Sequence, residues 1–194
     1  MSQEHLHEHQ QHEHLVETKL ASREIYKGRV VKLEECDVRL PNNRTSIREV
    51  VRHPGAVAVL AESADGELLL VRQYRFAPAE VLLELPAGKL EEGEDSKVCA
   101  YRELQEETGY DAKDMQPVFQ FYTSPGFADE RIDLFYATEL TAGDTHLDDD
   151  EFVDVEAYGR DELAEKLQNG SIRDAKTLIG VMWWLQQSAP TGRG

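Results

Sequence analysis

The sequence predicts a mixed α+β chain, in which a central sheet is covered by helices. Short apolar runs alternate with turn signals along most of the 194 residues, as expected for a sheet of many strands. Three segments, 96–108, 160–168 and 174–187, instead have the spacing or the ends of helices. Hydrophobic residues make up 40% and charged residues 30% of the chain, which is ordinary for a globular protein with one real core.

The strands are expected in chain order. Residues 25–33 and 35–40 read as strands, and Pro41-Asn42-Asn43 turns the chain into a strand over 46–52. The near-continuous apolar run at 56–62 indicates a buried strand, and Asp65-Gly66 predicts a hairpin into 67–76. Further strands are expected over 81–85, 118–123, 131–139 and 151–158.

The helices follow from their ends and their faces. Gly109 is suited to end the first helix, and Gly170 closes the second. The third helix has a broad apolar face. At 100° per residue, one face of the first helix carries Glu103, Glu106 and Glu107, and Val98, Tyr101 and Leu104 are expected to pack on the sheet from the opposite face.

Composition divides the chain and limits its function. Residues 1–18 hold five of the seven histidines and are expected to form a disordered tail; a loose transition-metal site is the alternative. We expect a strand region over 19–52, the main domain over 53–187 and a frayed end over 188–194.

The net charge of −17 disfavours binding to nucleic acid or to an anionic membrane. No apolar run approaches the roughly 20 residues of a membrane span, and the N-terminus lacks a secretory apolar segment. We therefore expect a cytoplasmic protein. Cys36 and Cys99 are far apart and are expected to be small buried hydrophobic residues.

The acidic stripe of the first helix needs an explanation. A solvated acidic face is the simplest, but these glutamates lie toward the helix C-terminus, where the macrodipole disfavours negative charge. Carboxylates together with a backbone carbonyl from Pro86-Ala87-Gly88 are the ligands that Mg²⁺ or Mn²⁺ takes. Because Mg²⁺ usually adds substrate phosphates to few protein carboxylates, the pattern favours a phosphate-bearing substrate.

The segment from Gly88 to Tyr110 resembles the Nudix box. Five residues separate Gly88 from Glu94, and seven more precede the run Arg102-Glu103-Leu104-Gln105-Glu106-Glu107-Thr108-Gly109-Tyr110. The resemblance implies the Nudix fold, an α/β/α sandwich around a mixed sheet, and hydrolysis of a nucleoside diphosphate linked to another group. It implies that Glu103, Glu106, Glu107 and the carbonyl of Ala87 bind divalent metal, and that Arg102 and Glu94 orient these ligands.

The flanks resemble the ADP-ribose pyrophosphatase subgroup. In "YTSPGFADE", Pro125 lies fifteen residues after Tyr110, the spacing of that subgroup. The resemblance assigns Glu130 to orienting or deprotonating the attacking water, with Asp129 as the alternative. Pro125 and Gly126 are expected in the substrate loop.

Upstream segments and the "DAKT" at 174–177 also resemble that subgroup. Arg48 and Arg75 match arginines that contact substrate, and Tyr26 is the candidate that stacks on adenine. The resemblance also implies a homodimer in which N-terminal strands swap between subunits.

The implied reaction is ADP-ribose plus water giving AMP and ribose 5-phosphate, with Mg²⁺ as cofactor and Mn²⁺ as the alternative. Another nucleotide sugar, a dinucleoside polyphosphate or flavin adenine dinucleotide are alternative substrates. A Nudix-like domain that binds ADP-ribose without cleaving it is the alternative outside catalysis. Such domains commonly lose acids of the box, and this sequence keeps them.

Overall fold

The computed structural model describes residues 12–143 and 152–187. Most of the expected tail, the frayed end and the acidic residues 148–151 lie outside these ranges. The chain divides into two compact units, Met1–His53 with Ser124–Asp129, and Pro54–Thr123 with Glu130–Gly194. They are called the N-terminal unit and the C-terminal unit below. No helix among the described residues is long and apolar enough to cross a membrane.

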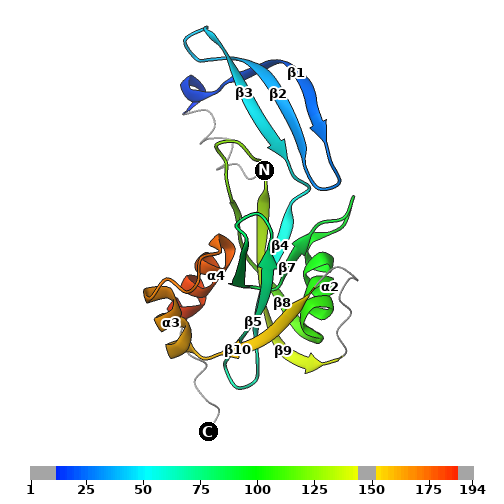
Figure 1. The fold of residues 1–194 in the computed structure, drawn as a ribbon, viewed down its shortest axis with the longest axis vertical. Coiled ribbons are helices and arrows are strands. Elements are labelled where there is room, and N and C mark those ends of the chain that lie inside the picture. Colours follow the sequence, from blue (N-terminus) through cyan, green and yellow to red (C-terminus); the bar gives the residue numbers. More distant parts are fainter. Residues whose placement is uncertain (1–11, 144–151, 188–194) are drawn as a thin grey trace. The chain divides into compact units, whose positions relative to one another are not determined.

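The N-terminal unit is built on an antiparallel three-stranded sheet of order β1-β2-β3 (blue to cyan in Figure 1). A 3-10 turn, η1 (Glu13–Leu15), precedes it, so ordered structure begins inside the segment expected to be a tail. The strands are β1 (Thr18–Lys27), β2 (Lys32–Arg39) and β3 (Thr45–Arg52).

The strand expected over 25–33 is wrong, because a turn interrupts it. The Gly28 amide donates to the Val31 carbonyl at 2.9 Å and reverses the chain between β1 and β2. The separate segment 124–129 is bound to β3 through Val51. The Val51 amide donates to the Phe127 carbonyl at 2.8 Å, and its carbonyl accepts from the Asp129 amide at 3.1 Å.

The C-terminal unit contains a mixed seven-stranded sheet of order β10-β5-β4-β9-β8, with β6 paired to β5 and β7 paired to β4. Only the pairing of β4 with β9 is parallel among the strand pairs described. The strands are β4 (Ala56–Glu62), β5 (Leu68–Arg75), β6 (Glu80–Glu84), β7 (Ala87–Lys89), β8 (Tyr110–Tyr122), β9 (Arg131–Ala142) and β10 (Val153–Tyr158).

Helices cover both faces of this sheet: α2 (Ser96–Thr108) covers one, and α3 (Arg160–Gln168) and α4 (Ala175–Gln186) cover the other (Figure 1). The fully buried strand β4 divides its side chains between two cores. Leu60 packs in a cluster with Val181 and Trp184, whereas Val59 packs in a cluster with Leu104. The predicted α/β/α sandwich around a mixed sheet is confirmed.

Two further elements, both in the C-terminal unit, differ from the sequence prediction. Residues 87–89, expected as a loop, form the short strand β7, because Val57 in β4 pairs with Gly88. Strand β8 begins at Tyr110 rather than at 118, because β9 provides an antiparallel partner along its whole length. Both strands depend on pairing with distant residues.

Candidate active site

Helix α2 carries the box glutamates, and both of its ends are capped. Asp95 caps its first turn by accepting from the Lys97 and Val98 amides, and Gly109 ends it with φ of 73°. Tyr101 and Leu104 pack in the core as predicted, but the predicted separation of faces is wrong for Val98 and for the acids. Val98 is 59% exposed, while Glu103 and Glu107 are 9% and 4% exposed and share the buried face with Leu104. The acids point inward because polar partners there replace water.

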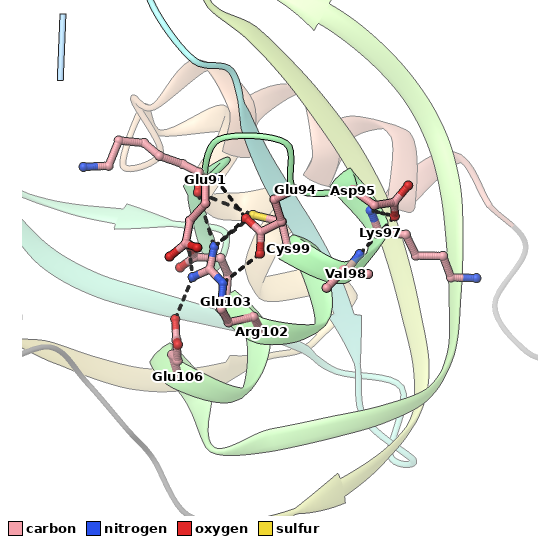
Figure 2. A network of polar contacts seen from close by, with 10 residues as sticks. Glu91, Glu94, Asp95, Lys97, Val98, Cys99, Arg102, Glu103 and Glu106 are labelled. Carbon is pink, nitrogen blue, oxygen red and sulfur yellow. Dashed lines mark hydrogen bonds and ion pairs between the residues drawn. The ribbon is translucent and has the colours of Figure 1, made fainter.

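Arg102 connects the acids to one another (Figure 2). Its Nε and Nη2 atoms both donate to the Glu94 carboxylate at 3.0 Å. Its Nη1 donates to Glu103 at 2.8 Å and to Glu106 at 2.9 Å. One guanidinium thus contacts three carboxylates, and the orienting role of Arg102 and Glu94 stays a prediction.

These surroundings shift the pKa values of Glu94 and Cys99. The hydrogen bond from Arg102 lowers the pKa of Glu94 to about 2, so this carboxylate is ionised at neutral pH. Cys99 lies beneath the same network and is buried, as is Cys36, which confirms the prediction for both. Burial raises the pKa of Cys99 to about 12, so its thiol stays protonated and unreactive.

Strand β7 approaches α2 closely enough that a side chain at Gly88 would collide with the site. A Cβ on Gly88 would lie 1.9 Å from the carboxyl carbon of Glu103. The amide of Ala87 donates to Oε2 of Glu107 at 2.9 Å. The Ala87–Gly88 backbone and the two buried glutamates therefore form one packed unit, in which a side chain at position 88 would displace the Glu103 carboxylate or the strand.

The oxygen atoms of these glutamates suit a hard divalent cation, although the three carboxylates do not surround a common point among the described residues. Within the described part of the chain, no three His, Cys, Asp or Glu side chains lie close enough together to hold a metal ion. Glu103 and Glu106 face Arg102, and Glu107 faces the Ala87 amide. Two buried carboxylates beside the glycine backbone are nonetheless oxygen ligands of the type that Mg²⁺ takes.

Arg75, predicted to contact substrate, lies at the end of β5. Its Nε and Nη2 atoms donate to the two oxygens of Glu84 at 2.8 Å each. Lys176 also pairs with Glu84. Glu84 and Lys176 were not predicted as site residues; the "DAKT" motif at 174–177, which contains Lys176, was the signal that could have indicated the lysine.

Glu130 belongs to the C-terminal unit and is held by Thr123. The Thr123 hydroxyl donates to Oε2 of Glu130 at 2.6 Å, and the Thr123 amide donates to the Glu130 carbonyl at 3.2 Å. Asp129, the alternative base, belongs to the N-terminal unit. It accepts from Arg52 Nη1 and from the His53 amide, each at 2.9 Å, so it already binds groups of the scaffold.

The other predicted substrate residues lie in the N-terminal unit. Arg48 on β3 donates to the Ser46 hydroxyl and the Ile47 carbonyl, each at 3.0 Å, and pairs with Glu17. Tyr26 on β1 is 59% exposed. Pro125 and Gly126 lie in segment 124–129 of the same unit. The structure thus groups the acids, Arg75 and Glu130 in one unit and these four residues in the other.

Comparisons with known proteins place the chain. Residues 51–179 match the NUDIX domain model. A methanol dehydrogenase activator of Bacillus methanolicus is 47% identical over 175 residues, which cover 89% of this chain and 95% of that protein. An ADP-ribose pyrophosphatase of Bacillus subtilis is 43% identical over 171 residues, covering 87% and 92%.

A solved structure described as an ADP compounds hydrolase has the same fold. It superposes with a TM-score of 0.76 at 20% identity and covers 88% of this chain and 92% of that one. The domain match and the two relatives agree with the box residues on α2, and the chain belongs to the Nudix family of hydrolases.

Proposed function

We propose that this Nudix hydrolase cleaves the diphosphate of ADP-ribose, giving AMP and ribose 5-phosphate. The observation that carries the proposal is the 43% identity to an ADP-ribose pyrophosphatase along 87% of the chain. The buried Glu103 and Glu107 beside Gly88 support it, because they form the acidic centre that such a reaction requires. Water adds to one phosphorus atom, the bridging P–O bond breaks, and the leaving phosphate takes up a proton.

The proposed cofactor is Mg²⁺, with Mn²⁺ as the alternative. Glu103, Glu106, Glu107 and the Ala87 carbonyl would hold it. When bound, such an ion lowers the pKa of water and neutralises charge on phosphoryl oxygens. Arg102 holds the carboxylates of Glu103 and Glu106 through hydrogen bonds from Nη1.

The remaining residues bind substrate and accept a proton in this proposal. Arg75 and Arg48 provide positive charge for the diphosphate, and Pro125 with Gly126 line the substrate loop. Tyr26 stacks on the adenine. Glu130 accepts the proton of the attacking water, and Thr123 fixes its carboxylate through the 2.6 Å hydrogen bond.

The first experiment incubates purified protein with Mg²⁺ and ADP-ribose and measures AMP and ribose 5-phosphate. Glu107→Gln is the matched variant, because it removes one charge and keeps the shape. We expect its kcat to fall at least about 10²-fold, since a metal ligand is lost. Near-normal turnover in Glu107→Gln would remove this residue from the site.

The same assay on a panel of compounds tests the alternatives. GDP-mannose, a dinucleoside polyphosphate and flavin adenine dinucleotide replace ADP-ribose under identical conditions. If the enzyme cleaves one of these compounds in preference to ADP-ribose, that compound becomes the proposed substrate. Tight binding of ADP-ribose without product would indicate a binding domain instead of an enzyme.

A second candidate function follows from the 47% identity to a methanol dehydrogenase activator. This chain would then increase the activity of a methanol dehydrogenase. The test adds wild type or Glu107→Gln to the dehydrogenase of Bacillus methanolicus and measures methanol oxidation. Activation by wild type alone would connect the effect to hydrolysis, and no activation by either would exclude this function for that dehydrogenase.

We further propose that the protein is a cytoplasmic homodimer. The three-stranded sheet of the N-terminal unit supports the dimer. It exposes large apolar side chains at Leu20, Ile25, Tyr26 and Ile47.

A further inference from the structure

Glu84 is a buried acid that the Nudix box does not include. It lies at the end of β6, and only 1% of its surface is exposed. Its carboxylate accepts both hydrogen bonds of the Arg75 fork at 2.8 Å and also pairs with Lys176. Burial by itself raises the pKa of Glu84, but these two cations outweigh it and the pKa is lowered. Glu84 is therefore an anion between two cations.

Lys176 comes from the first turn of α4 and is itself well enclosed. Its side chain is 11% exposed, and its Nζ also lies 3.1 Å from Asp174 Oδ2. Asp174 caps α4 by accepting from the Thr177 amide at 2.9 Å, and the Thr177 hydroxyl accepts from the Leu85 amide at 2.8 Å. The start of α4 and the end of β6 are thus fixed to each other, and Lys176 has little freedom to move.

Arg75 is the exposed member of this group. Its side chain is 41% exposed, although Glu84 occupies the edge that carries Nε and Nη2. Hydrogen bonds to Glu84 raise the pKa of Arg75 most, and the charge of Glu107 raises it further. Glu84 also lies close in sequence to Ala87, whose amide binds Glu107, so the guanidinium lies near the acidic centre. The hydrogen bonds to side chains that are described for Arg75 go to Glu84 through Nε and Nη2 and do not use Nη1.

We propose that Glu84, held in turn by Lys176, is a positioning residue that aims the open edge of Arg75 at the substrate diphosphate. This inference rests on the proposed function, because it requires a diphosphate beside the acids. Glu84 does not touch substrate. It fixes one edge of a planar fork so that the other edge has a defined direction.

The surroundings explain why such a residue is needed. An arginine near Glu107 is attracted to that carboxylate, and a pair between them would consume both a cation for substrate and a ligand for metal. The buried Glu84 competes for Arg75 through two parallel hydrogen bonds of 2.8 Å each. Glu84 thus keeps Arg75 away from the metal ligands.

The test is a double-variant cycle on ADP-ribose hydrolysis with Glu84→Gln, Arg75→Gln and both together. Arg75 contacts a group that is charged before and during the reaction, so Glu84→Gln is expected to raise KM about tenfold with kcat changed less than about threefold. In the Arg75→Gln background, Glu84→Gln should change KM by less than about twofold, because its effect passes through Arg75.

Glu156→Gln is the matched control. Glu156 on β10 forms the same two-bond pair with Arg72 of β5, at 2.8 and 2.9 Å, but Arg72 has no place in the proposed site. The Glu156→Gln variant should lower the stability of the protein without raising the KM for ADP-ribose. Because Glu84→Gln leaves Lys176 without its buried partner, Glu84→Gln/Lys176→Met is made as well. This second variant restores charge balance and keeps the protein folded while removing the support of Arg75.

Each outcome decides the proposal. A raised KM that disappears in the Arg75→Gln background supports it. Unchanged KM in both Glu84 variants, or effects that add to that of Arg75→Gln, overturns it and leaves the proposed function intact. Wild type that cleaves no ADP-ribose overturns the proposed function and this inference together.

Discussion

At the scale of single residues, the protein buries several acids and satisfies each in a different way. Arg102 and the Ala87 amide serve the box glutamates, and two cations serve Glu84. Glu62 instead accepts from the Tyr136 hydroxyl at 2.7 Å and from the Trp184 indole, which are neutral donors. Cations thus pair with Glu103 and Glu84, whereas neutral groups donate to Glu107 and Glu62.

Glu130 is the predicted base, and its removal should affect turnover rather than folding. We expect Glu130→Gln to lower kcat at least about 10²-fold with little change in KM, because the attacking water loses its proton acceptor. Steady-state kinetics and thermal unfolding measure the two effects. Asp129→Asn is the neighbouring control and should mainly lower stability, since Asp129 binds Arg52 and the His53 amide.

Full turnover in Glu130→Gln would place the base elsewhere. A loss of turnover in Asp129→Asn would then assign this role to Asp129, the alternative base.

Glu94 should make the stability of the protein depend on acid pH. Its pKa is lowered to about 2 by Arg102, so its stabilising effect is complete above its ordinary value of 4.5 and disappears as the pH falls toward 2. Between about pH 6 and about pH 2.5, the free energy of unfolding of wild type should fall by about 2 kcal/mol more than that of Glu94→Gln.

Urea unfolding at a series of pH values measures this difference. Glu92→Gln, on an exposed neighbour, should follow the wild-type curve. Parallel curves for wild type and Glu94→Gln would show that the pair with Arg102 does not stabilise the fold.

At the scale of elements, the site depends on how closely β7 approaches α2. Gly88→Ala places a Cβ 1.9 Å from the Glu103 carboxyl carbon, so the carboxylate or the strand must move. We expect kcat to fall at least about tenfold, because a displacement of about 1 Å in a catalytic centre has large effects. Kinetics and circular dichroism distinguish this from unfolding.

Gly159→Ala is the control for the same chemical change. Its Cβ would meet no atom nearer than 3.7 Å, at Glu162 Oε2, and its φ is −74°. It should keep wild-type turnover. Equal activity in Gly88→Ala would mean that Glu103 can leave its buried position without loss, which contradicts its proposed role.

At the scale of the whole molecule, the proposed dimer depends on the apolar surface of the N-terminal unit. Ile25→Asp puts a charge on a side chain that is 50% exposed in the single chain. If that side chain is buried between subunits, the charge should convert the dimer to a monomer of 22.0 kDa, as measured by light scattering.

Met182→Asp on α4 is the control, because Met182 is 53% exposed but lies in the other unit. It should leave the mass unchanged. A wild-type mass of one chain would contradict the dimer directly. A dimer that survives Ile25→Asp would move the interface to another surface.

The sequence by itself determined the helices, the buried strand and the family. Segments 96–108 and 160–168 begin and end as predicted, because caps and glycines act within a few residues of each other. The β4 run was recognisable because every residue in it is apolar except one. The box residues were found by spacing, which needs no knowledge of the fold.

Only the tertiary structure decided which groups surround those residues. Strand β7 and the first half of β8 exist because β4 and β9 pair with them. Glu103 and Glu107 face inward because Arg102 and Ala87 meet them there, which helical periodicity alone could not indicate. Glu84 and Lys176 are 92 residues apart in sequence and meet because α4 packs at the end of β6. Such contacts join residues that are distant in sequence, so local sequence patterns do not predict them.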